Sequence, residues 1–380
     1  MIKPNIFVIA GRTGGPLLPA MAIANKLEEY NPIIIGVKNS FEEKYSKQNN
    51  LELLYLPEAK LTLASFSKLS FLEIVKEIVL LFVMVFLLFY SFFRSIYYIF
   101  KYRPMAIITA GSFLAVPLGY ACYFTNFFRS SKTKIIIHQQ DAKISLSNKI
   151  VAPLAHKLTC YFKTSIEQFR GQKPTLVTNP IDFGRYNKEN IEKTIVDPLL
   201  KNFVEEKTKP LLLIFGGGSG AVAINKWVFE TIEELNKTFK ILHLTGVLQQ
   251  SGIYSLNNSQ DYQAVDFLGL EMPYVLYHSD LVICRAGMSS ITELLYLQKP
   301  AFLIPIPNSH QELNAKQVQT YFPTLRQQFT MTKSGKESWL NNITKIYPEY
   351  FGRISYPEKS EIENSFLVYI EEIKKIIKAV

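Results

Sequence analysis

The sequence predicts an α/β protein with two halves, each built on a parallel sheet that helices cover on both faces. Three observations lead to this fold class. Short apolar runs alternate with helical patterns along most of the chain, as in β–α–β units. The alternation stops at the polar, charge-rich segment 183–209 and then restarts. The length of 380 residues also suits two domains, because single cores stop growing at roughly 250–300 residues.

The expected strands of the first half are almost continuous apolar runs, which is typical of strands buried on both faces. They cover residues 6–10, 33–37, 51–56, 105–110, 134–138, 158–161 and 175–177. Residues 17–30 have the spacing of a helix. Ser40 and Glu43 form a capping box that would start a second, short helix.

The second half repeats this pattern after a connector over 183–209. Its expected strands cover residues 211–215, 240–244, 264–268, 281–284 and 301–304. Helices are expected over 225–237 and, at the end of the chain, over 362–379, where apolar residues recur at helical spacing.

Composition and charge narrow the class of protein. Apolar residues make up 48% of the chain and charged residues 19%, which excludes a disordered chain. The net charge of +10 favours anionic partners, namely phosphates, an anionic membrane surface or nucleic acid. We expect no nucleic-acid partner, because no helix carries a dense basic face. The three cysteines, none in a C-x-x-C pair, exclude a disulfide scaffold, and the first apolar run is too short for a signal peptide.

Each half begins with a strand, a glycine-rich loop and a helix, as in two Rossmann-like domains that face each other. The loops are Gly11-Arg-Thr-Gly-Gly15 and Gly216-Gly-Gly-Ser-Gly220. Glycines there let backbone N–H groups approach an anion at the helix N-terminus. Neither loop is a Walker A motif, and a tight turn is the alternative for each. Two loops in equivalent places favour phosphate or pyrophosphate binding.

Further polar residues follow the later strands of the second half. Glu293 lies in the first turns of the helix after Cys284-Arg-Ala-Gly287, where a carboxylate suits both hydroxyls of a ribose. The alternative is that Glu293 offsets the helix dipole. Gln311 and Asn314 are three residues apart and share a helix face, which suits sugar hydroxyls or a solvated surface equally.

Six motifs occur in order along the chain. They are Gly11-Arg-Thr-Gly-Gly15, His138-Gln-Gln-Asp141, Asn179-Pro180, Gly216-Gly-Gly-Ser-Gly-Ala221, Cys284-Arg-Ala-Gly287 through Glu293, and His310-Gln-Glu-Leu-Asn314-Ala315. In this combination the chain resembles the MurG family, the peptidoglycan glycosyltransferases of family 28 that add N-acetylglucosamine to lipid I. Related galactolipid and glucolipid synthases share the Arg-Ala-Gly and Glu element, but the second and last motifs fit the MurG branch better.

The resemblance implies a GT-B fold with a cleft between two domains. Residues 1–181 would bind the acceptor and the membrane, residues 182–357 would bind UDP-N-acetylglucosamine, and a helix over 358–380 would pack back on the first domain. The reaction would invert the anomeric centre without a metal ion or a cofactor.

The resemblance also assigns roles to single residues. Glu293 would bind the ribose, Gln311 and Asn314 with His310 would hold the sugar, and Arg285 would stabilise the leaving group. The diphosphate would meet Gly217, Gly218 and Ser219, and the uracil would meet Phe267, Leu268 and Met272. The acceptor would meet Arg12, Thr13, Gly14, Gly15, Asp141 and Asn179.

The chain departs from the family at the expected base. The family's first loop usually ends in a histidine, and here that position is Pro16, which cannot accept a proton. Asp141 is our candidate for the general base, with His138 as the second candidate. The alternatives are that Asp141 caps a helix starting near Ser145 and that His138 is a buried structural residue. The family's arginine after Asn-Pro is also missing, because Asp182 stands there.

Residues 78–93 are apolar and uncharged, and as a helix they would be about 24 Å long. A full crossing of the membrane would put strands of one sheet on opposite sides. We therefore expect 71–103 to lie in the interface of an anionic membrane or to enter it as a shallow re-entrant helix, at the cytoplasmic face of the inner membrane. The alternative is an unusually apolar helix buried in the core.

The function expected from the sequence is transfer of N-acetylglucosamine from UDP-N-acetylglucosamine to lipid I, a polyprenyl-pyrophosphate-linked acceptor. Two alternatives stay open. One is a family member that acts on diacylglycerol or another polyprenyl lipid. The other is a catalytically weak homologue that binds nucleotide sugar or lipid.

Overall fold

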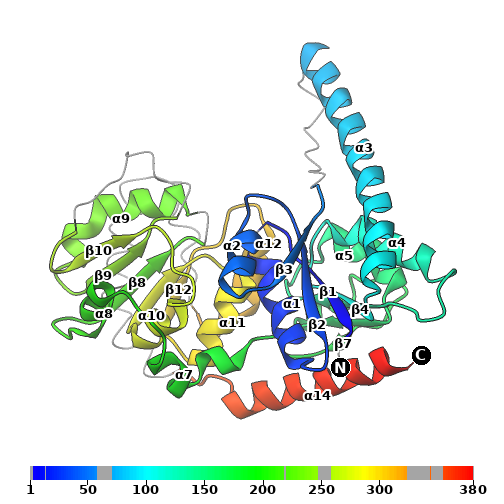
Figure 1. The fold of residues 1–380 in the computed structure, drawn as a ribbon. Helices are drawn as coiled ribbons and strands as arrows, with labels where there is room; N and C mark the ends of the chain where they lie inside the picture. The colour runs from blue at the N-terminus through cyan, green and yellow to red at the C-terminus, as the bar shows by residue number, and fades with distance from the viewer. Residues whose placement is uncertain are drawn as a thin grey trace. The chain divides into compact units, whose positions relative to one another are not determined.

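The computed structural model describes residues 3–12, 14–57, 71–217, 220–246, 258–322, 343 and 354–379 (Figure 1). The chain forms two compact units. The first unit comprises Met1–Gln140, Ile144–Pro180 and Phe366–Val380, and the second comprises Asp141–Lys143 and Ile181–Ser365.

The first unit is built on a parallel sheet of seven strands in the order β3-β2-β1-β4-β5-β6-β7. The strands are β1 Asn5–Ile9, β2 Asn31–Gly36, β3 Glu52–Tyr55, β4 Ala106–Thr109, β5 Lys134–Gln139, β6 Lys157–Cys160 and β7 Thr175–Leu176. β2 and β3 lie on one side of β1, and β4 to β7 lie on its other side. The loops after β1 and β4 therefore meet at the topological switch point of the sheet.

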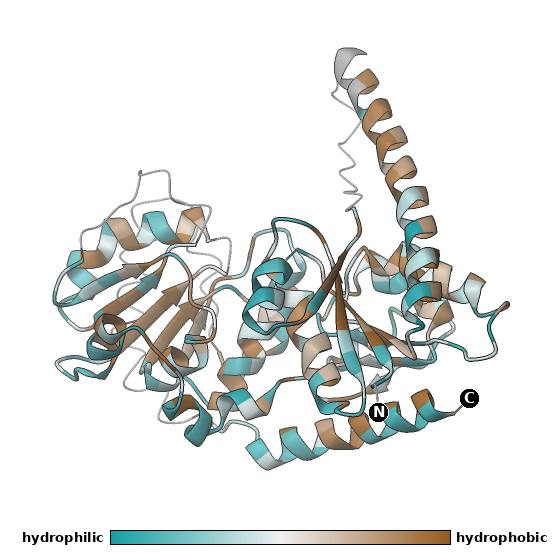
Figure 2. Cartoon of the chain, in the orientation of Figure 1, coloured by the Kyte–Doolittle hydropathy of each residue, from teal (hydrophilic) through white to brown (hydrophobic). Residues whose placement is uncertain are grey.

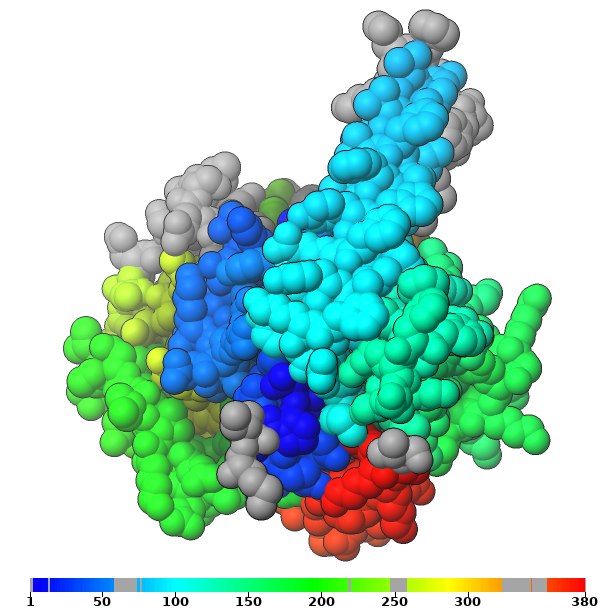
Figure 3. Space-filling model, turned by 45° about the vertical axis from the view of Figure 1, so that its right-hand side comes forward, coloured from blue at the N-terminus to red at the C-terminus, as the bar shows by residue number. Residues whose placement is uncertain are grey.

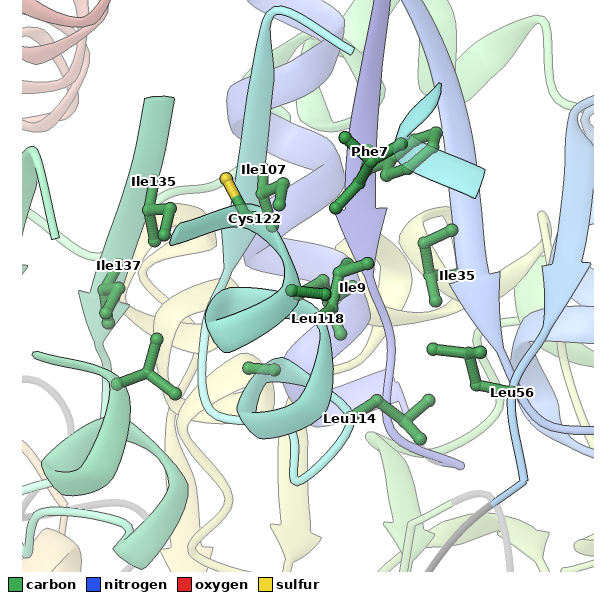
Figure 4. Close-up of a cluster of buried hydrophobic side chains, with 14 of the residues drawn as sticks. Phe7, Ile9, Ile35, Leu56, Ile107, Leu114, Leu118, Cys122, Ile135 and Ile137 are labelled. Carbon is green, nitrogen blue, oxygen red and sulfur yellow. The ribbon is translucent and has the colours of Figure 1, made fainter. Parts of the chain in front are cut away.

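Helices cover the sheet of the first unit. They are α1 Gly14–Lys26, α2 Phe41–Gln48, α3 Phe71–Tyr102, α4 Ala115–Thr125, α5 Leu146–Val151, η2 Ala152–Leu154, α6 Lys163–Ile166 and most of α14 Lys359–Lys378. Apolar strand residues such as Phe7, Ile35 and Ile135 pack against Leu118 and Cys122 of α4 (Figure 4). This core fixes the carboxyl edge of the sheet, from which the loops carrying polar residues emerge.

The second unit repeats the design with a parallel sheet of five strands in the order β10-β9-β8-β11-β12. The strands are β8 Leu211–Phe215, β9 Lys240–Leu244, β10 Tyr262–Val265, β11 Leu281–Cys284 and β12 Ala301–Leu303. The helices are η3 Phe183–Tyr186, α7 Lys188–Glu192, α8 Pro198–Glu205, α9 Val222–Leu235, α10 Met272–His278, α11 Met288–Leu297 and α12 His310–Gln317.

Two local expectations were wrong. Segment 183–209 is not only a connector, because it carries η3, α7 and α8. The side chain of Asn187 caps α7 and that of Asp197 caps α8, with Pro198 as the first helical residue. The expected capping box of α2 is incomplete: the Ser40 hydroxyl donates to the carbonyl of Val37 instead of capping α2.

The domain limits also differ in detail from the expectation. The chain passes to the second unit after Pro180 rather than after residue 181, and Asp141–Lys143 cluster with the second unit although β5 belongs to the first. The final helix, α14, is divided between the units after Ser365.

The helix α3 stands clear of the rest of the first unit over its N-terminal half (Figures 1 and 3). Its C-terminal half is held by hydrogen bonds from the Tyr98 hydroxyl to the carbonyl of Tyr55 (3.0 Å) and from the Ser91 hydroxyl to that of Pro57 (3.2 Å). Figure 2 shows the protruding half as strongly hydrophobic. Within α3, residues Glu77–Tyr102 are long and apolar enough to cross a membrane, and few of them are buried. Since Phe86 is 68% exposed, α3 is not a core helix.

Candidate functional site

The glycine loop of the first unit follows β1 at the carboxyl edge of the sheet. Arg12 has a φ of 65°, in the left-handed region that costs a residue with a Cβ about 1–2 kcal/mol. Its amide donates to Oε1 of Glu42 (3.0 Å), and the amide of Val37 donates to the same oxygen (3.1 Å). Glu42 is fully buried, so a buried carboxylate holds the loop in place. Gly14 and Gly15 begin α1 directly after it.

His138, near the end of β5, is fully buried in the first unit. Its Nε2 lies 2.9 Å from Oδ1 of Asn179, and its Nδ1 lies 3.0 Å from Oγ1 of Thr159. Burial lowers the pKa of His138 to about 4. Both ring nitrogens are engaged, and a pKa of about 4 makes the ring a weak proton acceptor, which speaks against His138 as the base. Asn179 is also buried, and its side-chain oxygen is used to hold this ring.

Asp141 belongs to a polar cluster in the second unit. Its Oδ1 accepts a hydrogen bond from Nδ2 of Asn314 (2.8 Å) and lies 3.7 Å from Nε2 of His310. Burial raises the pKa of Asp141, although the charge of His310 and the Asn314 hydrogen bond act in the opposite direction. The helix α5 is capped by Ser145, whose hydroxyl accepts from the amide of Asn148 (3.2 Å), so Asp141 is not needed as its cap.

Asn314, on α12, is fully buried and anchors this cluster. Besides Asp141, its Nδ2 donates to the carbonyl of Ala286 (3.3 Å), and its Oδ1 accepts from the amide of Ala142 (2.9 Å). Both amide protons are therefore used, and Oδ1 accepts a hydrogen bond as well. The amide of Asn314 holds Asp141 and Ala142 against the start of α11.

Glu293 lies on α11, which begins after Gly287 at the end of β11. Its Oε1 accepts a hydrogen bond from the hydroxyl of Tyr186 (2.7 Å), on η3. Burial raises the pKa of Glu293, while the Tyr186 hydrogen bond and the charge of Arg185 lower it. Glu293 lies beyond the first turn of α11, where the effect of the helix dipole has fallen off, so the dipole does not explain this partly buried carboxylate.

The glycine loop of the second unit joins β8 to α9 through a tight turn. Gly217 has a φ of 94° and Gly220 a φ of 81°, and the amide of Gly220 donates to the carbonyl of Gly217 (2.9 Å). A Cβ at Gly216 would lie 2.3 Å from the Cβ of Ala221, so the loop requires glycine there. The predicted site residues Gly218 and Ser219, like Thr13 in the first unit, lie outside the described residues.

The remaining predicted residues follow three strands of the second sheet: Arg285 follows β11, His310 and Gln311 follow β12, and Leu268 and Met272 follow β10. The Arg285 guanidinium donates to the carbonyls of Ile304 (3.2 Å) and Pro305 (3.3 Å), and burial lowers its pKa. Oε1 of Gln311 accepts from the amide of Ile306 (3.2 Å), while His310 is half exposed at the start of α12. Leu268 is buried, and the partly buried Met272 begins α10.

Across the described ranges, no group of three or more His, Cys, Asp or Glu side chains is placed to hold a metal ion. Cys122, Cys160 and Cys284 are unpaired and buried.

These two units, each a parallel sheet with a glycine loop between its first strand and helix, define the GT-B class of nucleotide-sugar enzymes. Solved structures with this fold include the MurG of Acinetobacter baumannii, at a TM-score of 0.61 and 20% identity over 98% of this chain and 99% of that chain. The UDP-GlcNAc 2-epimerase of Neisseria meningitidis is also similar, at a TM-score of 0.60 and 12% identity over 98% and 100%. The fold alone therefore does not separate transferases from epimerases.

Comparison with models of protein families separates glycosyltransferases from epimerases. Residues 6–159 match the N-terminal domain of glycosyltransferase family 28, and residues 211–328 match its C-terminal domain. The chain belongs to glycosyltransferase family 28. It is similar to the UDP-N-acetylglucosamine--N-acetylmuramyl-(pentapeptide) pyrophosphoryl-undecaprenol N-acetylglucosamine transferases of Clostridium novyi and Clostridium tetani. The identities are 25% over 99% of this chain and 100% of the relative, and 27% over 98% of each.

Tyr186 and Arg185 were not predicted, because segment 183–209 was expected to be a connector. Arg185 lies three residues after Asp182, and its charge lowers the pKa of Glu293. The signal that could have found them is the aromatic-basic pair itself, directly before the capping residue Asn187.

Proposed function

We propose that this protein transfers N-acetylglucosamine from UDP-N-acetylglucosamine to the polyprenyl-pyrophosphate-linked muramyl-peptide of lipid I during peptidoglycan synthesis. The observation that carries the proposal is Glu293, a partly buried carboxylate on α11 that the hydroxyl of Tyr186 holds through a hydrogen bond to Oε1. Its Oε2 has no hydrogen-bond partner in the described part of the chain and is available to a ribose hydroxyl. The names of the curated relatives supply the sugar and the acceptor.

The donor would bind to the second unit. The diphosphate meets the turn at Gly217 together with Gly218 and Ser219, where backbone N–H groups bind an anion. Leu268 and Met272 contact the uracil, and Arg285 stabilises the charge that develops on the diphosphate. The sugar hydroxyls would bind Gln311 and His310, with Asn314 beneath them.

Asp141 would serve as the general base in a single inverting displacement that requires no metal ion. The acceptor hydroxyl gives its proton to Asp141, its oxygen forms a bond to the anomeric carbon, and the bond from that carbon to the diphosphate breaks. Burial supports this role because it raises the pKa of Asp141 toward the working pH. The first-unit loop at Arg12, Gly14 and Gly15 would face the acceptor's pyrophosphate.

The first unit would contact the cytoplasmic face of the inner membrane through α3. Phe82 is 71% and Phe86 is 68% exposed, and the exposed Phe127 and Phe128 follow the end of the neighbouring α4. Phe92 of α3 packs on Phe124 of α4, with 6.3 Å between ring centroids, so the two helices form one apolar surface. Basic side chains border it: Arg94, Lys101, Arg103, Arg129 and Lys132. Such a border suits anionic lipid headgroups.

The ends of the apolar segment support a re-entrant rather than a crossing arrangement. Pro57, before the segment, accepts a hydrogen bond from Ser91 within α3 (3.2 Å). Pro57 and the middle of α3 therefore lie side by side. About 30 Å of helix extends beyond that point over residues 71–90, which lets an apolar segment enter the lipid while both ends stay on one side.

A panel of donors and acceptors tests the function. Purified full-length protein is given UDP-N-acetylglucosamine, UDP-glucose or UDP-galactose with lipid I or diacylglycerol, with and without EDTA. We expect product only from UDP-N-acetylglucosamine with lipid I, in the β configuration by NMR and at the same rate in EDTA. Glycosylated diacylglycerol would contradict the acceptor assignment. UDP binding without turnover on either acceptor would instead identify a catalytically weak homologue.

A further inference from the structure

Tyr186 lies in segment 183–209, which was expected to be a connector, yet its side chain is buried. It ends the short helix η3, a few residues after the chain enters the second unit at Ile181. Tyr186 is only 5% exposed, and its hydroxyl donates to Oε1 of Glu293 at 2.7 Å. Burial raises the pKa of Tyr186 well above its ordinary value, so the hydroxyl keeps its proton and remains a donor.

Among the described groups around Glu293, the Tyr186 hydroxyl is the one that fixes the orientation of its carboxylate. Glu293 faces the Tyr186 hydroxyl, the charge of Arg185 and the buried thiol of Cys284, which stays protonated because burial raises its pKa. Tyr186 is thus the neutral donor that fixes one carboxylate oxygen. A carboxylate group whose Oε1 accepts a hydrogen bond keeps Oε2 in one orientation. Without that hydrogen bond the carboxylate group rotates about its terminal side-chain torsion.

We propose that Tyr186 is a positioning residue, which orients Glu293 so that the site prefers a ribonucleotide to a 2′-deoxyribonucleotide. The inference rests on the proposed role of Glu293 in binding the ribose. A ribose diol donates two hydrogen bonds, and a fixed carboxylate gains from both. A 2′-deoxyribose lacks one of these donors and leaves part of the partly buried carboxylate of Glu293 unpaired, so the deoxynucleotide should bind more weakly.

A second tyrosine on α11 provides a matched control. Tyr296 packs edge-on against Tyr186, with 6.1 Å between ring centroids, and its hydroxyl hydrogen-bonds Oε1 of Glu363. Tyr296 is also buried, at 3% exposure. Tyr296→Phe therefore removes the same kind of hydrogen bond from the same packed region without touching Glu293.

The experiment compares UDP with 2′-deoxy-UDP by titration calorimetry, using full-length wild-type protein, Tyr186→Phe, Tyr296→Phe and Glu293→Gln. We expect wild type and Tyr296→Phe to bind UDP about tenfold more tightly than 2′-deoxy-UDP. Tyr186→Phe and Glu293→Gln are expected to bind the two nucleotides within about twofold of each other. Thermal unfolding of the two phenylalanine variants separates a loss of orientation from a loss of stability.

The outcomes distinguish the inference from the proposed function. If Tyr186→Phe keeps the wild-type preference while Glu293→Gln loses it, only the positioning role is overturned. If wild type has no preference, or Glu293→Gln keeps it, the ribose role of Glu293 fails and the inference fails with it.

A second measurement applies if Tyr186→Phe does not fold. Fluorotyrosine placed at position 186 keeps the packing and is a stronger donor. Because a stronger donor favours the ionised form of Glu293, UDP binding should persist to a lower pH than in wild type, and the preference for UDP should remain. An unchanged pH profile would overturn the inference.

Discussion

At the scale of single residues, the proposed role of Asp141 as the general base can be tested through the pH dependence of the rate. A general base must be ionised to accept a proton, and burial raises the pKa of Asp141. The rate should therefore fall, as the pH is lowered, at a higher pH than an ordinary carboxylate would give. Asp141→Asn should reduce turnover about 10²–10⁴-fold and remove this acid limb, with little effect on UDP affinity.

The control for Asp141→Asn is Asp182→Asn, because Asp182 is a carboxylate of the same unit outside the Asn314 cluster. It should keep both the rate and the acid limb of wild type. Steady-state rates with lipid I between pH 5 and pH 9 measure both variants. Unreduced turnover in Asp141→Asn would exclude Asp141 as the base.

The sequence encodes helix faces better than contacts between distant segments. Gln311 and Asn314 were expected from their spacing to share a helix face, and the family resemblance gave them the role of holding the sugar. That spacing carries no information on Asp141, 173 residues earlier, which is bonded to Asn314. A contact at that separation depends on how two loops of the folded chain meet, and no local rule encodes it.

At the scale of elements, α3 gives the prediction that separates a membrane surface from a merely apolar helix. Replacing Phe86, Phe89 and Phe93 with serine should weaken binding to vesicles containing phosphatidylglycerol by more than tenfold, because the three rings are 68%, 62% and 64% exposed. Flotation measures the bound fraction. Turnover of a water-soluble lipid I analogue should stay at the wild-type level, because these side chains lie outside the proposed site.

The matched variant for α3 replaces Ile195 and Leu199 of the second unit with serine. These residues are 92% and 75% exposed, so the change removes comparable apolar area from another surface. It should leave flotation unchanged. Equal loss in both variants, or no loss in the α3 variant, would contradict the membrane role of α3.

Elements differ in how clearly the sequence encodes them. The apolar strands β8 and β9 have the limits expected from the sequence, because strands buried on both faces read as continuous apolar runs. The short helices α7 and α8 were missed, although Asn187 and Asp197-Pro198 are ordinary helix-start signals. Their polar, highly charged composition hid them, since each buries only one or two side chains.

At the scale of the whole molecule, both units bury a histidine on a sheet strand in the same way. His138 in the first unit and His243 in the second each place Nε2 near the side-chain oxygen of an asparagine, Asn179 at 2.9 Å and Asn225 at 3.1 Å. Burial lowers the pKa of both histidines to about 4. The sequence showed histidines on strands, but their neutrality follows from burial, which only the folded sheets create.

These two histidines predict how the stability of each unit depends on pH. An unfolded histidine binds a proton below about pH 6.5, whereas each folded one does so only below about pH 4. Between these values the unfolded state binds more protons, so the free energy of unfolding should fall as the pH is lowered, by up to about 3 kcal/mol for each histidine. Urea unfolding at pH 7, 5.5 and 4.5 measures the fall, with circular dichroism for the whole chain and fluorescence of the buried Trp227 for the second unit.

His243→Gln should be less stable than wild type at pH 7, because Gln replaces a hydrogen-bonded ring, yet lose less stability on acidification. His138→Gln should behave in the same way in the first unit, and variants that lose as much stability as wild type between pH 7 and pH 4.5 would rule out a contribution from these histidines.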